Sequence, residues 1–194
     1  MTIISNDIAK AIEILNNEDV VAIPTETVYG LAGNIYSEKA IRKIFEVKQR
    51  PFFNPLIVHI HTIEQIEELV SEFPAKARKL AATFWPGSLT LILKKKSNIP
   101  DLITAGKDAV AIRIPNHPVT LSLLKELSCP VAAPSANPFN RISPTSSLHV
   151  EHYFKETIPM ILEGGECENG IESTIIGFEN NEPVLYRLGA ISIE

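Results

Sequence analysis

An arginine interrupts a run of apolar residues that otherwise has the composition of a buried strand. Arg113 stands between Ala109-Val110-Ala111-Ile112 and Ile114. A guanidinium inside a protein needs a carboxylate or a phosphate beside it, because an unpaired charge is very unfavourable away from water. Arg113 therefore pairs either with an Asp or Glu of this chain or with an anionic ligand, and the sequence leaves both alternatives open.

Polar side chains follow three apolar segments that end at proline. The segments end at Ile23-Pro24, Ile114-Pro115 and Ala133-Pro134, and the residues that follow are Thr25-Glu26-Thr27, Asn116-His117 and Ser135-Ala136-Asn137. Proline has no N–H to donate, so it ends a strand and turns the chain out of the sheet. Because ligands of α/β proteins gather beyond strand ends, we expect these segments to share a site. The alternatives are simple strand termination and a mixed sheet that separates the ends.

Positive charge is concentrated in one part of the chain. Lysine and arginine occur at Lys39, Arg42, Lys43, Lys48 and Arg50, whereas residues 156–186 contain neither. This distribution suits a small anion such as a nucleotide. A general nucleic-acid coat is disfavoured, because the net charge is −5 and such proteins present a basic face. Lys48 shares the apolar side of its predicted helix, so snorkelling of its side chain to the surface is the ordinary alternative.

Several well-known signatures are absent. The sequence has no G-x-x-x-x-G-K-[ST], G-x-G-x-x-G or G-x-S-x-G, so a nucleotide would bind by another design and a serine hydrolase is poorly supported. Cys129 and Cys167 are not in a C-x-x-C pair, which favours free thiols in a reducing cytoplasm. The N-terminus does not resemble a signal peptide, and no apolar run approaches the ~20 residues that cross a bilayer. We expect a soluble, cytoplasmic protein.

Short strands alternate with helices along the chain. Its 194 residues, 45% hydrophobic and 21% charged, predict one globular domain over 1–194. Helices are expected at 8–15 (capped by Ser5 or Asn6), from Ser37, after a Thr62/Gln65 capping box, from Pro74 to Phe84, and at 117–127 and 145–154. Strands are expected at 20–23, 56–60, 89–93, 109–114, 131–133, 159–162, 174–178 and 184–188. The interleaving predicts an α/β fold, and the closely spaced final strands indicate a mixed sheet.

Taken in order, these segments resemble the YrdC-type threonylcarbamoyl-AMP synthase family. The resemblance is carried by Pro24-Thr25-Glu26-Thr27-Val28-Tyr29-Gly30-Leu31, Lys48-Gln49-Arg50-Pro51, Asn54-Pro55-Leu56-Ile57-Val58-His59, Phe84-Trp85-Pro86-Gly87-Ser88-Leu89-Thr90, Val110 to Pro115, Ala133 to Asn137, Ser143-Pro144-Thr145, Gly170 to Thr174 and Arg187-Leu188-Gly189. Six or more motifs in a fixed order make it specific. Gln49 is a departure, since the family often has glycine there. The end at Glu194 resembles the short, single-domain type.

The resemblance implies a fold, an activity and partners. The fold is a twisted, mostly mixed sheet flanked by helices around a basic cavity. The activity is nucleotidyl transfer: L-threonine, bicarbonate or CO₂, and ATP give threonylcarbamoyl-AMP and pyrophosphate, with Mg²⁺ assisting. A separate transfer complex then modifies adenosine 37 of ANN-decoding tRNAs, and direct contact with tRNA or double-stranded RNA would be weak.

The resemblance also implies roles for particular residues. ATP would be bound by Lys48, Arg50, Asn54, Ser135, Asn137, Ser143 and Arg187. Threonine would be held by Thr27, His59, Arg113 and Ser173. Arg113 would then have the substrate carboxylate as its partner. Lys48 and Arg50 are the expected catalytic cations, because charge accumulates on phosphoryl oxygens. His59 is the best candidate for a general base, and the sequence does not identify metal ligands.

Two other functions fit parts of the same pattern. One is an RNA-binding module of the same fold, which the net charge of −5 disfavours. The other is a carbamoyl or sugar-phosphate enzyme on the same scaffold, because a fold alone does not separate related activities. Ser135-Ala136-Asn137 together with Lys48 and Arg50 favours the synthase.

Overall fold

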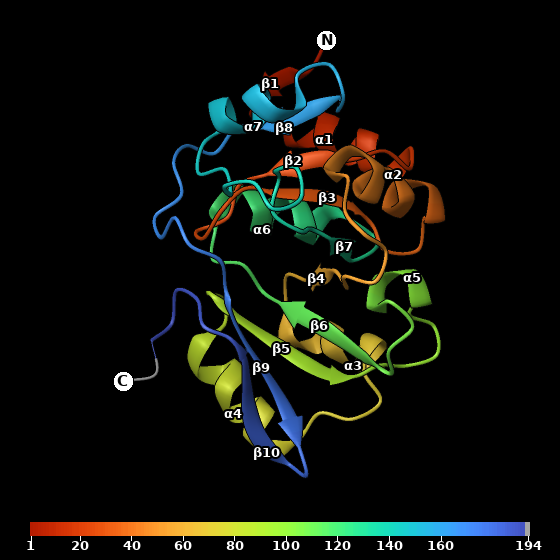
Figure 1. Cartoon of the computed structure of the whole chain (residues 1–194), viewed down its shortest axis with the longest axis vertical. Coiled ribbons are helices and arrows are strands. Elements are labelled where there is room, and N and C mark those ends of the chain that lie inside the picture. Colours follow the sequence, from red (N-terminus) through yellow and green to blue (C-terminus); the bar gives the residue numbers. More distant parts are fainter. Residues whose placement is uncertain (193–194) are drawn as a thin grey trace.

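Ten strands pair into one mixed sheet with helices on both faces (Figure 1). The computed structural model describes residues 1–192, so the last two residues of the predicted domain 1–194 lie outside the description. The strands are β1 (Ile3–Ser5), β2 (Val21–Ile23), β3 (Gly30–Asn34), β4 (Ile57–His59), β5 (Leu89–Lys94), β6 (Ala109–Arg113), β7 (Val131–Ala132), β8 (Met160–Leu162), β9 (Thr174–Glu179) and β10 (Glu182–Arg187). The α-helices are α1 (Ile8–Asn16), α2 (Glu38–Lys48), α3 (Ile66–Leu69), α4 (Ala75–Phe84), α5 (Asp101–Thr104), α6 (Pro118–Glu126) and α7 (Ser147–Phe154).

The strand order is β1-β8-β2-β3-β7-β4-β6-β5-β9-β10. The pairs β1–β8, β8–β2, β4–β6 and β5–β9 are parallel, and the other neighbours are antiparallel. The predicted α/β fold with a mixed sheet is therefore confirmed. Figure 1 shows β1 at one edge and the β9–β10 hairpin at the other.

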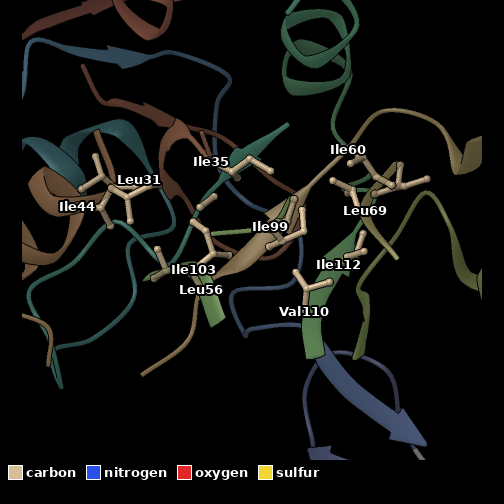
Figure 2. Packing of buried hydrophobic residues seen from close by; sticks show 14 of the residues in the cluster. Leu31, Ile35, Ile44, Leu56, Ile60, Leu69, Ile99, Ile103, Val110 and Ile112 are labelled. Carbon is tan, nitrogen blue, oxygen red and sulfur yellow. The ribbon is translucent and has the colours of Figure 1, made fainter. Parts of the chain in front are cut away.

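Alternate side chains of the central strands enter two separate cores. Val21 and Ile23 pack in a cluster with Leu15 of α1 and Leu123 of α6. Ala22, between them, belongs to the larger cluster on the other face, as the period of two in a strand requires. Figure 2 shows this larger cluster, to which β3, α2, α5 and β6 contribute.

Local capping chemistry explains several helix starts. Ser37 caps α2 by accepting a hydrogen bond from the Ala40 backbone N–H, and Thr62 and Gln65 form the predicted capping box. The predicted cap of α1 is wrong. Asp7, rather than Ser5 or Asn6, accepts from a backbone N–H in the first turn, because the cap must directly precede the first helical residue.

The sequence pattern does not predict β3, nor the short elements β1 and α5. In β3, Gly30-Leu31-Ala32-Gly33-Asn34 contains two glycines, which usually weaken a strand. A β-carbon at Gly33 would lie 3.0 Å from Cδ1 of Ile44 and 3.3 Å from Cβ of Ala40. A side chain here would have to displace its neighbours on α2, which packs closely on the sheet, so the position favours glycine.

The central strands are short, which brings both of their ends close to one site. From the pairings, β2 and β7 run in one direction and β6 runs in the other. However, β7 has two residues and β4 has three, so each spans roughly 10 Å or less. The segments that follow the prolines contact their neighbours: Asn116 N–H donates to Oε2 of Glu26 at 3.0 Å, and Leu31 N–H donates to the Pro134 carbonyl at 2.7 Å.

Candidate functional site

A cavity of about 280 Å³ lies where the segments after the central strands meet. Seven of the residues with predicted ligand contacts line it: Thr27, Arg50, His59, Arg113, Ser135, Ser173 and Arg187. The wall also contains Thr25, Glu172 and the apolar side chains of Ile57, Ile92 and Ile175. Its volume is close to the lower end of the roughly 300–1,000 Å³ that is usual for ligand sites. Three guanidinium groups and one carboxylate thus face a small, partly apolar space.

The guanidinium of Arg113 has a protein carboxylate as its partner. Its Nη2 donates to Oε1 of Glu26 at 2.6 Å, its Nη1 donates to Oγ1 of Thr27 at 2.9 Å, and its Nε donates to the Gly87 carbonyl at 3.1 Å. Both side chains of the ion pair are only 5% exposed. Of the two alternatives that the sequence leaves open, a carboxylate of this chain is therefore the partner that the structure contains. Since a guanidinium carries five N–H groups, these three bonds leave two of them for a ligand.

His59 is buried beside Arg113. Burial, and to a lesser extent the charge of Arg113, lowers the pKa of His59 to about 3. Its Nδ1 lies 3.2 Å from the carbonyl oxygen of Ile57, so we assign the proton to Nδ1, which leaves Nε2 as an acceptor. A base with so low a pKa is poorly matched to proton transfer near pH 7. His59 is therefore better suited to accept a hydrogen bond than to act as the predicted general base.

Ser173, a predicted threonine contact, is hydrogen-bonded to Arg187, a predicted ATP contact. Ser173 Oγ lies 2.7 Å from Oγ1 of Thr90 and accepts a hydrogen bond from Nη2 of Arg187 at 3.1 Å. The same Nη2 donates to the Ser173 carbonyl at 2.8 Å. A side chain predicted to hold threonine thus touches one predicted to bind ATP, which is the arrangement needed if the two ligands react.

Arg50 lies in the cavity wall next to a second cation. Its Nη2 donates to the Pro55 carbonyl at 3.0 Å, and its guanidinium carbon lies 5.7 Å from the centre of the Phe139 ring. Burial, together with the charge of Arg187, lowers the pKa of Arg50. Within residues 1–192, no carboxylate forms an ion pair with Arg50. Two nearby guanidinium groups are mutually unfavourable, and an anion between them would relieve this repulsion.

Lys48 lies behind the cavity wall. Its side chain is 1% exposed, and its Nζ donates to the carbonyl oxygens of Ser135 at 2.5 Å and Asn137 at 2.6 Å. Burial lowers the pKa of Lys48 to about 7, and the charge of Arg50 contributes to the shift. The alternative of snorkelling is therefore wrong. The ammonium group has two backbone partners of its own, and it supports the loop that carries Ser135.

The residue after Lys48 shows why glycine suits this position. Gln49 ends α2 with a φ of +51°, in the left-handed region that glycine enters without steric cost. The departure from the family pattern thus places a side chain in a backbone conformation that favours glycine.

Three further predicted ATP contacts, Asn54, Asn137 and Ser143, do not line the cavity. Nδ2 of Asn54 and Oδ1 of Asn137 are buried, and neither has a hydrogen-bond partner among the residues described. A buried polar atom without a partner is unfavourable, and neither atom is placed by the cavity wall to meet a ligand. Ser143 Oγ donates instead to Oε1 of Glu172, which does line the cavity.

Two acidic side chains at the site are missing from the predicted set. Glu26 pairs with Arg113, and Glu172 accepts from Ser143. Each directly precedes a predicted threonine contact, Thr27 or Ser173. This adjacency, and their place in the motifs that carry the resemblance, are signals in the sequence, but neither tells a ligand contact from a structural carboxylate.

The fold and the cavity give the class of protein, and comparison with known proteins gives its family. A mixed sheet covered by helices, with three arginines in the wall of one small cavity, defines the class as α/β. A family model described as "Telomere recombination", which covers the Sua5, YciO and YrdC proteins, matches residues 13–189. The chain belongs to this Sua5/YciO/YrdC family, and the resemblance carried by the motifs is confirmed.

Several relatives share much of the sequence. The threonylcarbamoyl-AMP synthase of Pyrococcus abyssi is 49% identical over 90% of this chain and 52% of the relative. The threonylcarbamoyl-AMP synthase of Bacillus subtilis is 47% identical over 96% of this chain and 54% of the relative. A crystal structure of P. abyssi Sua5 complexed with L-threonine has a TM-score of 0.93 and 45% identity, and the match covers 97% of this chain and 58% of that chain. This chain therefore spans about half the length of these relatives.

No helix in residues 1–192 combines the length and apolar composition of a membrane span. Within the same residues, no three or more His, Cys, Asp or Glu side chains converge as metal ligands do.

Proposed function

We propose that this chain synthesises threonylcarbamoyl-AMP from L-threonine, bicarbonate or CO₂, and ATP, with release of pyrophosphate. One observation carries the proposal. All four predicted threonine contacts and three predicted ATP contacts line a single cavity, in a chain 47–49% identical to proteins named threonylcarbamoyl-AMP synthase. The likeness to a threonine-bound Sua5 structure supports the same choice of amino acid.

The proposed chemistry joins three small reactants. The threonine amine forms a bond to the carbon of CO₂ and loses a proton, which gives a carbamate. A carbamate oxygen then attacks the α-phosphorus of ATP, the bond to the β-phosphate bridging oxygen breaks, and pyrophosphate leaves with the electron pair. This is adenylyl transfer, and it needs no protein nucleophile.

The side chains of the cavity have separate tasks in this reaction. Arg50 and Arg187 would neutralise charge on the phosphoryl oxygens, since positioning and electrostatic stabilisation dominate such transfers. The two remaining N–H groups of Arg113 would bind the threonine carboxylate. Nε2 of His59 would accept a hydrogen bond from the threonine hydroxyl or its nitrogen. Holding the reactants together also lowers the entropic part of the barrier.

We propose that Mg²⁺ enters with ATP. Magnesium is commonly held by substrate phosphates and one or two carboxylates rather than by a full protein cage. The single carboxylate in the cavity wall, Glu172, with the Ser143 hydroxyl beside it, fits that pattern. The metal would neutralise phosphate charge when bound, and Glu172 would be its protein ligand.

We also propose that the product passes to a separate tRNA threonylcarbamoyl-transfer complex and that the protein acts in the cytoplasm. The labile mixed anhydride needs an acceptor, and the free thiols of Cys129 and Cys167 suit a reducing compartment.

Pyrophosphate release tests the proposed function directly. Release from ATP should require L-threonine, bicarbonate and a divalent cation together, because the carbamate is the attacking group. Valine, which lacks the hydroxyl, should be a poor substitute for threonine. ATP turnover that is indifferent to threonine would contradict the synthase and favour another enzyme on this scaffold.

Arg113→Lys is expected to weaken threonine binding far more than ATP binding. Lysine keeps the charge but lacks the planar fork that can contact Glu26, Thr27 and a carboxylate at once. Loss of a charge-assisted hydrogen bond should cost about 1.5–3 kcal/mol, or roughly tenfold to over a hundredfold in affinity. Calorimetric titration of threonine into both proteins, saturated with a non-hydrolysable ATP analogue, measures the difference. Equal affinities would show that Arg113 serves the protein ion pair alone.

A further inference from the structure

Glu26 is a buried carboxylate that stands behind Arg113 as seen from the cavity. Its residue is 5% exposed, and it is not among the residues that line the cavity, whereas Arg113 is. We infer that Glu26 is a positioning residue, which fixes the guanidinium plane of Arg113 in the orientation that receives a carboxylate ligand. This inference rests on the proposed function, because it assigns that ligand as threonine.

The hydrogen bonds of Glu26 leave its carboxylate little freedom. Oε1 accepts from Nη2 of Arg113 at 2.6 Å and from Oγ of Ser88 at 2.9 Å. Oε2 accepts from the backbone N–H of Asn116 at 3.0 Å. Ser88 precedes β5 and Asn116 follows β6, so the carboxylate is anchored to two segments besides its own. A group held this firmly can impose an orientation on the mobile end of an arginine.

Arg113 needs such a constraint because its strand fixes only its backbone. The arginine side chain has several rotatable bonds, and their freedom is lost when it binds a ligand. Glu26, Thr27 and Gly87 together use three N–H groups of the guanidinium, which sets the direction of the remaining two. Most of this ordering is therefore complete before a ligand arrives, and preorganisation of this kind raises affinity.

The charge of Glu26 has an opposing effect on an anionic ligand. A negative charge beside Arg113 reduces the attraction of the site for a carboxylate, so charge alone predicts that its removal strengthens binding. Orientation predicts the reverse. In Glu26→Gln the amide must place an NH₂ group against Arg113 or against the Asn116 N–H, and both are donors. In either placement two donors face each other, so the amide moves and the guanidinium bonded to it shifts as well. The effects of charge and of orientation are therefore distinguished by the sign of the change in affinity.

The test is calorimetric titration of L-threonine into the wild type, Glu26→Gln and a matched control, each saturated with a non-hydrolysable ATP analogue. Glu163→Gln is the control, because Glu163 also accepts several hydrogen bonds, from Ser147, Gly165 and Tyr29, but has no bond to Arg113. We expect tenfold or greater loss of threonine affinity in Glu26→Gln only. Affinity for the ATP analogue should stay within twofold in every protein.

A double variant shows whether the effect passes through Arg113. In the Arg113→Lys background, Glu26→Gln should change threonine affinity by less than twofold, because the group that it positions is already gone. If Glu26→Gln does not fold, Glu26→Asp, which keeps the charge but withdraws the carboxylate by one methylene, takes its place with an expected loss of at least threefold.

The remaining outcomes separate this inference from the proposed function. Unchanged or stronger threonine binding in Glu26→Gln, an equal loss of both ligands, or a full additional loss in the Arg113→Lys background would each overturn the positioning role. A wild type that binds the ATP analogue but no threonine would overturn the proposed function itself, and the role of Glu26 with it.

Discussion

Arg50→Ala is expected to lower the rate of threonine-dependent pyrophosphate release by about 10³-fold, the lower range for an arginine that stabilises a transferring phosphoryl group. Arg50 faces the cavity, and burial beside Arg187 already lowers its pKa. Its protein contacts include only carbonyl oxygens and an aromatic ring, so its positive charge is available to ATP. Steady-state rates over a range of ATP concentrations measure the loss.

The matched control for this change is Arg42→Ala. Arg42 is an exposed arginine of α2 whose partner is Glu38, one turn earlier, and its removal should leave the rate within twofold. Unfolding experiments on Arg50→Ala should show a free energy within about 1 kcal/mol of the wild type, because its hydrogen bonds to carbonyl groups are exposed or only partly buried, so that water can replace the lost donor. A variant that keeps its full rate would remove Arg50 from the proposed site.

Lys48→Ala is expected to reduce the free energy of unfolding by about 3 kcal/mol, which corresponds to a fall in Tm of roughly 6–12 °C for a chain of this size. The truncation removes two hydrogen bonds from a charged donor, each worth about 1.5–3 kcal/mol, and creates a cavity beneath α2. It leaves the buried Asn137 carbonyl without its Nζ donor, whereas the Ser135 carbonyl keeps the Asn137 N–H at 3.0 Å. Removal of a buried charge offsets part of this loss. Urea or thermal unfolding of the ligand-free protein provides the measurement.

The resemblance implies ATP phosphates as partners of Lys48, whereas in the structure its Nζ donates to two backbone carbonyls. Lys43→Ala is the control, since Lys43 pairs with Asp19 at the surface, with the two side chains about one-third exposed, and should cost less than about 1 kcal/mol. If Lys48→Ala melts with the wild type, the bonds from Nζ to Ser135 and Asn137 contribute nothing to stability.

The difference in free energy of unfolding between the wild type and Lys48→Ala should also depend on pH. Burial lowers the pKa of Lys48 to about 7 in the folded protein, whereas the unfolded chain has the ordinary value near 10.4. Between these values the unfolded state binds more protons, so Lys48 makes the wild type more stable as pH rises. The gap between wild type and variant should therefore widen from pH 7 to pH 9.

Local features of the chain determined most of the secondary structure. Ser37 and the Thr62/Gln65 pair satisfy backbone N–H groups only a few residues away, so a pattern in the sequence is enough to place these helix starts. The strands β5 and β6 are likewise predicted from a local feature, because each is a short apolar run in the sequence. The sequence pattern fails for β3, where Gly33 packs beneath α2. Glycine is normally unfavourable in a strand, so its presence there is explained by tertiary packing and not by local preference.

The candidate site, too, was predicted in part from the sequence and in part only from the structure. Motifs predicted which residues would gather, and seven of them line one cavity. The sequence also determined that a guanidinium would be buried at Arg113, because the residues around it are apolar. It could not determine the partner, since Asp, Glu and an external anion satisfy the charge equally well.

Only the tertiary structure decided these partners. Glu26 is 87 positions from Arg113, and Lys48 is 87 positions from the Ser135 carbonyl that it contacts. No periodicity or spacing encodes such pairs, because they depend on how α2, β6 and the proline-ended segments pack against one another. The physical reason is the high cost of burying an unpaired charge or polar group: composition shows that a partner must exist, and the three-dimensional packing of distant segments selects it.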